Sequence, residues 1–167
     1  RAYGGSVYPG KCPASWEAEV LRLTNAERAK VGSPALAAGN AQMVSAAAQW
    51  AQLSAQRNEF VHADSAWVGS RVGQPAHWSN ENIAWNYATP KLVMDGWMNS
   101  PGHKNNILYS TAQKMALGCY ADAYGSPYWV QMFFSESDPS KGPGVVTVTG
   151  GNLYDLQLGQ QLTAHQD

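Results

Sequence analysis

The sequence predicts an α+β domain in which helices come first and a pair of strands follows. Apolar residues recur at helical spacing in one segment after Ser15 and in another after Asn40. Segments 115–120 and 128–135 instead alternate with a period of two, which predicts two strands joined by a turn around residues 124–127. Helices followed by a strand pair indicate packed layers of helix and sheet.

Several local signals define the first helix. Ser15 is expected to cap it, because a serine oxygen accepts hydrogen bonds from the free N–H groups of a first turn. Acidic residues in the first turn, and Arg28 and Lys30 in the last, complement the helix dipole. Gly32 and Pro34 then end the helix.

Two further helices are predicted, with irregular stretches between and after them. The second follows Asn40 and ends near residues 57–58, and the third follows Thr89 with Pro90 at its first position. Pro101 is expected to end the third helix. Residues 59–88 and 102–110 show no sustained period and are predicted to be irregular, and so long an irregular stretch in a compact domain usually carries function.

The end of the chain is predicted to form a small hairpin after a linker rich in proline and glycine. Its two strands would cover residues 145–149 and 153–158, with the turn at Gly150 and Gly151. The 167 residues fit one domain, and a 44% hydrophobic composition with seven Trp can supply a sizeable core.

Charge and hydropathy exclude several classes of protein. The net charge is −1, only 14% of residues are charged, and the basic residues are scattered, so a nucleic-acid binder is not expected. No apolar stretch is long enough for a transmembrane helix. The first residues show no signal-peptide pattern, so we expect a mature secreted form or a cytosolic protein. Low charge and many aromatic residues favour the extracellular alternative.

Two cysteines and a few polar residues in the irregular segments carry the candidate chemistry. Cys12 and Cys119 are either one disulfide or two buried thiols. His62, Glu81 and His103 would form a three-ligand site for Zn²⁺ or a similar ion if their segments converge. Their spacing matches no local zinc motif, and histidines on the surface or in the core are the alternative.

The same residues suggest two other kinds of hydrolytic site, that of a serine hydrolase and that of a glycosidase. Ser100 lies three residues before His103, but no nucleophile-elbow motif surrounds it, so a polar residue at a helix end is the favoured interpretation. A glycosidase needs a second carboxylate beside Glu81. The sequence offers three acidic residues for that role, namely Asp64, Asp95 and Glu136. The sequence assigns no catalytic residue.

Four motifs in order make the chain resemble the CAP superfamily. They are LTNAERAK at 23–30, FVH at 60–62, NENIA at 80–84 and GWMNSPGHKNNIL at 96–108, followed by LGC at 117–119 and YWVQ at 128–131. That superfamily joins cysteine-rich secretory proteins, insect venom antigen 5 and plant pathogenesis-related proteins of group 1. The short SPGH form is similar to the microbial SCP-domain branch. The resemblance divides the chain into an N-terminal arm (1–15), a CAP domain (16–136) and a C-terminal extension (137–167).

The resemblance implies a three-layer α-β-α sandwich, secretion, and a central cleft with two His and two Glu. His62, Glu81 and His103 match three of these four positions, while Ser100 occupies the place of the second Glu. Asn82 and Ser100 are candidate cleft residues beside them. Asn80 replaces the glycine that normally precedes the Glu81 position. Two His and one carboxylate suffice to hold Zn²⁺ with an open coordination position.

The resemblance also bears on the cysteines and on ligands. Cys119 sits where the family often has a strand cysteine, so Cys12 and Cys119 are expected to be bonded. Many members are linked to sterols or fatty acids, and we expect a small apolar ligand of that kind here. A groove would be walled by aromatic residues of the irregular stretch, namely Trp67, Trp78, Trp85 and Tyr87. A metal-dependent hydrolase and a surface recognition protein in host interaction or defence are the alternatives.

Overall fold

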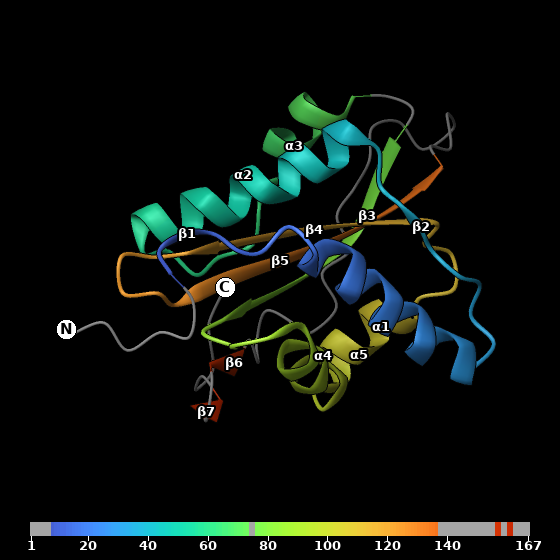
Figure 1. Ribbon diagram of the computed structural model, residues 1–167. Coiled ribbons are helices and arrows are strands. Elements are labelled where there is room, and N and C mark those ends of the chain that lie inside the picture. The colour runs from blue at the N-terminus through green and yellow to red at the C-terminus, as the bar shows by residue number, and fades with distance from the viewer. Residues whose placement is uncertain (1–7, 74–75, 137–155, 158–159, 162–167) are drawn as a thin grey trace.

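The chain folds into three layers, with a mixed β-sheet between two layers of helices (Figure 1). The computed structural model describes residues 8–73, 76–136, 156–157 and 160–161. The helices are α1 (Trp16–Lys30), α2 (Ala41–Arg57), α3 (Ser65–Val72), α4 (Pro90–Met98) and α5 (Pro101–Leu108). The strands are β1 (Gly10–Lys11), β2 (Ala37–Ala38), β3 (Ala76–Trp85), β4 (Lys114–Ala121), β5 (Pro127–Glu136), β6 (Leu156–Gln157) and β7 (Gln160–Gln161). The predicted α+β class and its three layers are therefore confirmed.

Three long antiparallel strands, β4, β5 and β3, form the centre of the sheet. The full order is β1-β4-β5-β3-β6-β7, and the short strand β2 lies parallel to β4. Strand β5 is the middle strand, with Met132 opposite Glu81 of β3 on one side and Ala116 of β4 on the other. The strand pair predicted at 115–120 and 128–135 lies within β4 and β5.

The two faces of the sheet bury separate apolar clusters. Helices α2 and α3 cover one face, and α1, α4 and α5 cover the other (Figure 1). Met132 and Phe134 point to the first face, whereas Trp129 and Phe133 point to the second, as the period of a strand requires. The cluster under α2 also includes Met43, Ala47, Val68 and Trp78, and the cluster under α1 includes Val20, Met94, Trp97 and Ile107.

Two of the three residues that precede the predicted helices cap them. The side chain of Asn40 accepts a hydrogen bond from Met43 N at 2.9 Å and caps α2. Thr89 caps α4 in the same way. Ser15 precedes α1 with helical backbone angles and makes no capping hydrogen bond from its side chain, so the predicted cap there is wrong.

Both stretches predicted to be irregular contain regular structure. Residues 59–88 include α3 and the ten-residue strand β3, and residues 102–110 largely belong to α5. Pro101 begins α5 instead of ending α4, because proline is well tolerated at a first helical position. The predicted tail hairpin lies mostly outside the described residues, whose only strands beyond 136 are β6 and β7.

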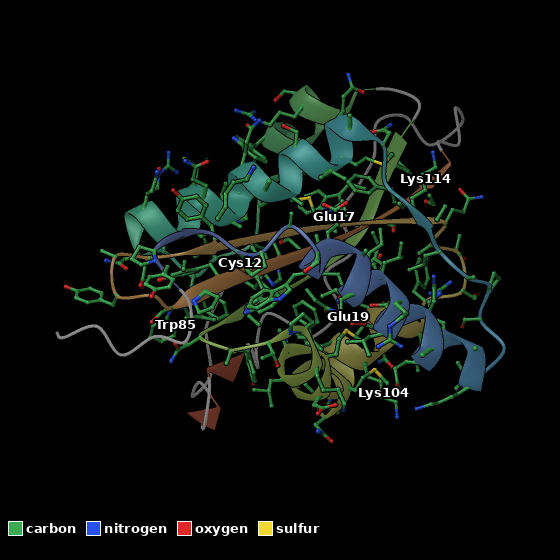
Figure 2. The ribbon with its side chains drawn as sticks, in the orientation of Figure 1. Cys12, Glu17, Glu19, Trp85, Lys104 and Lys114 are labelled. Carbon is green, nitrogen blue, oxygen red and sulfur yellow. A yellow bond between two sulfur atoms is a disulfide. The ribbon has the colours of Figure 1, made fainter. Side chains whose placement is uncertain are left out.

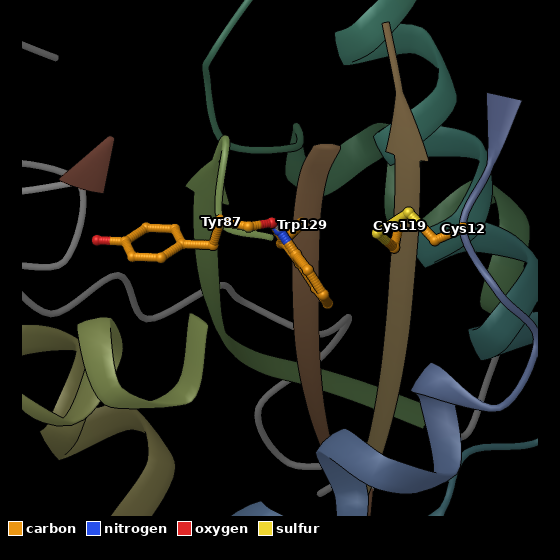
Figure 3. The surroundings of a disulfide bond; sticks show 4 residues. All are labelled: Cys12, Tyr87, Cys119 and Trp129. Atoms are coloured by element: carbon orange, nitrogen blue, oxygen red, sulfur yellow. Dashed lines mark hydrogen bonds between the residues drawn. A yellow bond between two sulfur atoms is a disulfide. The ribbon is translucent and has the colours of Figure 1, made fainter. Parts of the chain in front are cut away.

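A disulfide joins the N-terminal arm to the sheet. Cys12 and Cys119 are bonded, as the resemblance implied, and Figure 3 shows the bond reaching from the arm to β4. Strand β1 lies beside the same strand, with Gly10 opposite Ala121. Among the described residues, no helix is both long and apolar enough to cross a membrane.

Candidate functional site

His62 and Glu81 form a buried pair at the face of β3 that α3 approaches. His62 lies in the segment between α2 and α3, and its Nδ1 is 2.7 Å from Oε1 of Glu81. The same carboxylate oxygen accepts a hydrogen bond from Ala63 N at 3.1 Å. The side chain of Glu81 is fully buried and that of His62 is 12% exposed. The pair is therefore held in place by the protein, with the imidazole as its more accessible member.

Ser100 and His103 form a second buried pair within one turn of α5. Nδ1 of His103 lies 2.7 Å from Oγ of Ser100, and the two residues are 0% and 4% exposed, respectively. Ser100 occupies the N-cap position of α5, but its side chain makes no capping hydrogen bond to the helix backbone. Its hydroxyl instead fixes the ring of His103. Ser100 thus lies at the start of α5, and its role stays a prediction.

A network of buried side-chain amides connects these two pairs. Nδ2 of Asn106 donates to Glu81 O at 3.1 Å and to Oδ1 of Asn82 at 2.9 Å. Nδ2 of Asn82 donates to His103 O at 3.2 Å and to Oε1 of Gln131 at 3.1 Å. The network thus ties β3, β5 and α5 together in the interior, where each satisfied polar group also fixes its neighbours.

Three residues of this network are absent from the candidate site predicted from the sequence. Asn80, Asn106 and Gln131 are each 2% exposed or less, and Asn80 donates to Asn106 O at 3.2 Å. All three lie inside the motifs NENIA, GWMNSPGHKNNIL and YWVQ, so the motifs contained the signal. Only a buried position turns an asparagine or a glutamine into an obligatory hydrogen-bond partner, and the sequence did not predict burial here.

The expected three-ligand metal site is not assembled in the described part of the chain. No group of three or more His, Cys, Asp and Glu side chains there is arranged to hold a metal ion. Nδ1 of His62 is engaged by Glu81, whereas Nδ1 of His103 is engaged by Ser100. These contacts use Nδ1 of each ring, whereas histidine also binds Zn²⁺ through Nε2, so metal binding by these residues stays a prediction.

Two of the acidic residues considered as the second carboxylate of a glycosidase have other roles. Asp64 caps α3 by accepting a hydrogen bond from Trp67 N at 3.0 Å. Asp95 forms a surface ion pair with Lys91. The side chain of the third candidate, Glu136, lies outside the described part of the structure. A glycosidase-like acid pair therefore finds no support in Asp64 or Asp95.

The four aromatic residues expected to wall one groove are divided between different parts of the core. Trp78 is buried under α2, and Tyr87 is buried under α1 and α4. Burial raises the pKa of Tyr87 to about 12. Trp67 packs against Trp50, with ring centroids 5.1 Å apart, and Trp85 packs against Tyr128. These four side chains do not line a common groove.

A groove of mixed polar and apolar lining lies elsewhere, between α1 and α4, with Glu19 among its lining residues. Its volume is about 350 Å³. Trp16, Leu23 and Pro90 supply apolar surface, and Arg22 and Lys91 supply two cations at its edge. The sequence did not predict this groove, because its two walls are more than sixty residues apart in the chain and meet only in the fold.

Comparison with known proteins decides the family. The sequence profile of the CAP family, described as the cysteine-rich secretory protein family, matches residues 21–133. The chain belongs to the CAP family. The uncharacterized protein YkwD of Bacillus subtilis (strain 168) is 33% identical over 128 residues, which cover 74% of this chain and 48% of that protein.

Solved structures agree with this assignment. An extracellular protein containing an SCP domain from Bacillus anthracis str. Ames has 26% identity and a TM-score of 0.59, over 71% of this chain and 40% of that one. An outer surface protein from Borrelia burgdorferi shares the fold with 15% identity and a TM-score of 0.68, over 77% of this chain and 99% of that one. This CAP chain thus spans about half the length of YkwD and less of the Bacillus anthracis protein.

Proposed function

We propose that this CAP domain acts outside the cell and binds a small apolar ligand of the fatty-acid class in the groove between α1 and α4. The groove carries the proposal because Trp16, Leu23 and Pro90 give it apolar surface and its charged lining residues are two cations and the single carboxylate of Glu19. Apolar pockets with a few well-placed polar groups are the usual sites for small ligands. The disulfide, and the extracellular location stated for the Bacillus anthracis relative, support a location outside the cell.

The cations at the groove favour a carboxylate over a neutral sterol. Arg22 pairs with Glu19 at 2.6 Å and Lys91 pairs with Asp95 at 2.5 Å. Both basic side chains are about two-thirds exposed, at 68% and 70%. Exposed ion pairs of this kind contribute little to stability, so exchanging one for a ligand carboxylate costs little. An aliphatic chain would then lie along Trp16 and Leu23.

The buried polar centre does not favour the hydrolase alternative. Glu81 and His103 are fully buried, and Ser100 is 4% exposed. A hydrolase must bring water and substrate to its reacting groups. We therefore assign the His62–Glu81 pair and its amide network to the structure of the domain.

Binding of decanoate to the purified protein tests the proposal. We expect saturable binding by calorimetry, and an affinity roughly five- to tenfold lower for the variant Arg22→Gln/Lys91→Gln, because each exposed cation contributes a fraction of a kcal/mol. The matched control Lys30→Gln/Lys104→Gln removes the same charge away from the groove and should leave binding unchanged. His62→Ala should also bind normally if the polar centre is structural.

Three outcomes would contradict the proposal. No binding of decanoate would favour surface recognition. Tighter binding of a sterol than of decanoate, unchanged in Arg22→Gln/Lys91→Gln, would make the ligand a sterol instead of a fatty acid. Loss of binding in His62→Ala would move the site to the polar centre. Metal content measured by mass spectrometry on the same samples tests the expected Zn²⁺ separately.

A further inference from the structure

A second groove lies on the opposite side of the start of α1, and its wall contains a carboxylate that has no partner among the described residues. The groove has a volume of about 390 Å³. It is bounded by the arm at 11–14, by α2 and by β4, whereas the first groove faces α4. Figure 2 shows Glu17 and Glu19 on different sides of α1, toward α2 and toward α4 respectively.

The wall of this groove is mostly apolar and is held rigidly. Val44 and Ala48 come from α2, and Leu117 comes from β4. The disulfide partners Cys12 and Cys119 also line it, so the bond fixes the arm as one wall. A site whose walls are fixed before binding loses little conformational freedom when a ligand enters.

Trp16 supplies an aromatic ring that is fixed by stacking. Its ring lies 5.1 Å from that of Trp129, with only 8° between the planes. Trp129 is fixed in turn, because its Nε1 donates to Tyr87 O at 3.0 Å, and Figure 3 shows it beside the disulfide. An aromatic face can attract an organic cation by about 0.5–2 kcal/mol.

Glu17 is the feature that selects a ligand. It is partly buried in this groove, and among the described residues it makes no hydrogen bond or ion pair. Burial raises the pKa of its carboxyl above the ordinary value of 4.5. Lys11, exposed on the arm, is the other charged side chain of the groove, while α2 and β4 line it with groups that do not titrate. Within the part of the chain that the structure describes, this partly buried carboxylate thus has no ion-pair partner.

We propose that this second groove binds a small apolar molecule that carries an ammonium group, with the ammonium against Glu17 and Trp16 and the apolar part along Val44 and Leu117. A carboxylate beside an aromatic ring complements an organic cation in both charge and polarisability. The same carboxylate repels a fatty acid, so the two grooves have opposite preferences for charge. This inference does not depend on the ligand proposed for the first groove.

Three probes with one ten-carbon chain separate the sites, all used below their micellar concentrations. They are decyltrimethylammonium, decanol and decanoate. We expect decyltrimethylammonium to bind more tightly than decanol, and Glu17→Gln to lower its affinity roughly tenfold, as the loss of a partly buried charge partner would. Lys11→Gln should raise that affinity about twofold by removing a like charge. Glu27→Gln, a matched change later on α1, should have no effect.

Affinity should also depend on pH in a defined direction. The quaternary ammonium keeps its charge at every pH, so only the protonation of Glu17 matters for the pair. Because the pKa of Glu17 is raised, binding should weaken as the pH falls through a range that begins above 4.5. In Glu17→Gln this pH dependence should be absent.

A second variant, on the α2 wall of the groove, tests the binding site without changing Glu17. Val44→Trp fills the groove from α2 and should abolish binding of decyltrimethylammonium while leaving decanoate binding intact. Equal affinity of wild type and Glu17→Gln for the ammonium, or no preference for it over decanol, would overturn the inference. Failure of decanoate alone would overturn the proposed function and leave this one standing.

Discussion

The structural role of Arg28 differs from the role that its place in the sequence predicts. The sequence placed it among basic residues that suit the end of a helix dipole. It is in fact fully buried, and burial lowers the pKa of its guanidinium. It donates hydrogen bonds to carbonyl oxygens of the loop after α1 and of the C-terminal end of α5, at 2.7 Å to Pro34, 2.9 Å to Ile107 and 2.8 Å to Tyr109. One side chain thus joins the loop after α1 to the end of α5.

Replacing Arg28 should therefore destabilise the domain strongly. Arg28→Met keeps an apolar stem but leaves several buried carbonyls without donors, which should lower the free energy of unfolding by about 3–5 kcal/mol. Urea unfolding followed by circular dichroism measures this. The control Arg57→Met changes an exposed residue at the end of α2 and should shift stability by less than about 0.5 kcal/mol. A loss below about 1 kcal/mol in Arg28→Met would contradict the structural role given to it.

At the scale of elements, the sequence predicted α1, α2, α4 and the β4–β5 pair but missed β3, α3 and α5. Strand β3 was missed because four successive buried residues, Ser79 to Asn82, are all polar. The strand therefore shows no alternation of apolar and polar residues. Their side chains are partnered by β5, by α5 and, for Glu81, by the segment between α2 and α3. The resemblance to the CAP family could name His62 and Glu81, but not the hydrogen bonds that make them a buried pair.

The contact between α2 and β4 gives a test at this scale. Gly118 of β4 lies directly beneath α2, and a Cβ built there would come within 2.0 Å of Ala47 O. Gly118→Ala must push the helix away from the sheet, and we expect it to lower the free energy of unfolding by about 3 kcal/mol.

Gly69→Ala is the matched control for that prediction. Gly69 lies in α3 and an added Cβ there meets no atom within 4 Å. Alanine is the better helix former, so this change should raise the free energy of unfolding by about 0.5–1 kcal/mol. Equal effects of the two substitutions on thermal and urea unfolding would show that close packing at Gly118 does not limit stability.

For the whole molecule, the fold separates a buried polar centre from two grooves that meet at the first turn of α1. The polar centre joins the strands to α5, while the grooves lie on either side of Trp16, one toward α4 and one toward α2. The motifs NENIA, GWMNSPGHKNNIL and YWVQ supply the polar centre, whereas LGC lines the second groove and Leu23 of LTNAERAK lines the first. Grooves arise where distant segments meet, so the sequence pattern could not locate them.

The most direct test of the proposed function is a backbone amide NMR titration of the whole chain with decanoate. We predict that the largest chemical-shift changes fall on residues 15–23 and 89–91, which bound the groove between α1 and α4. The amides around His62, Glu81 and His103 should change little. Changes centred on those three residues, or no saturable change anywhere, would contradict the proposal.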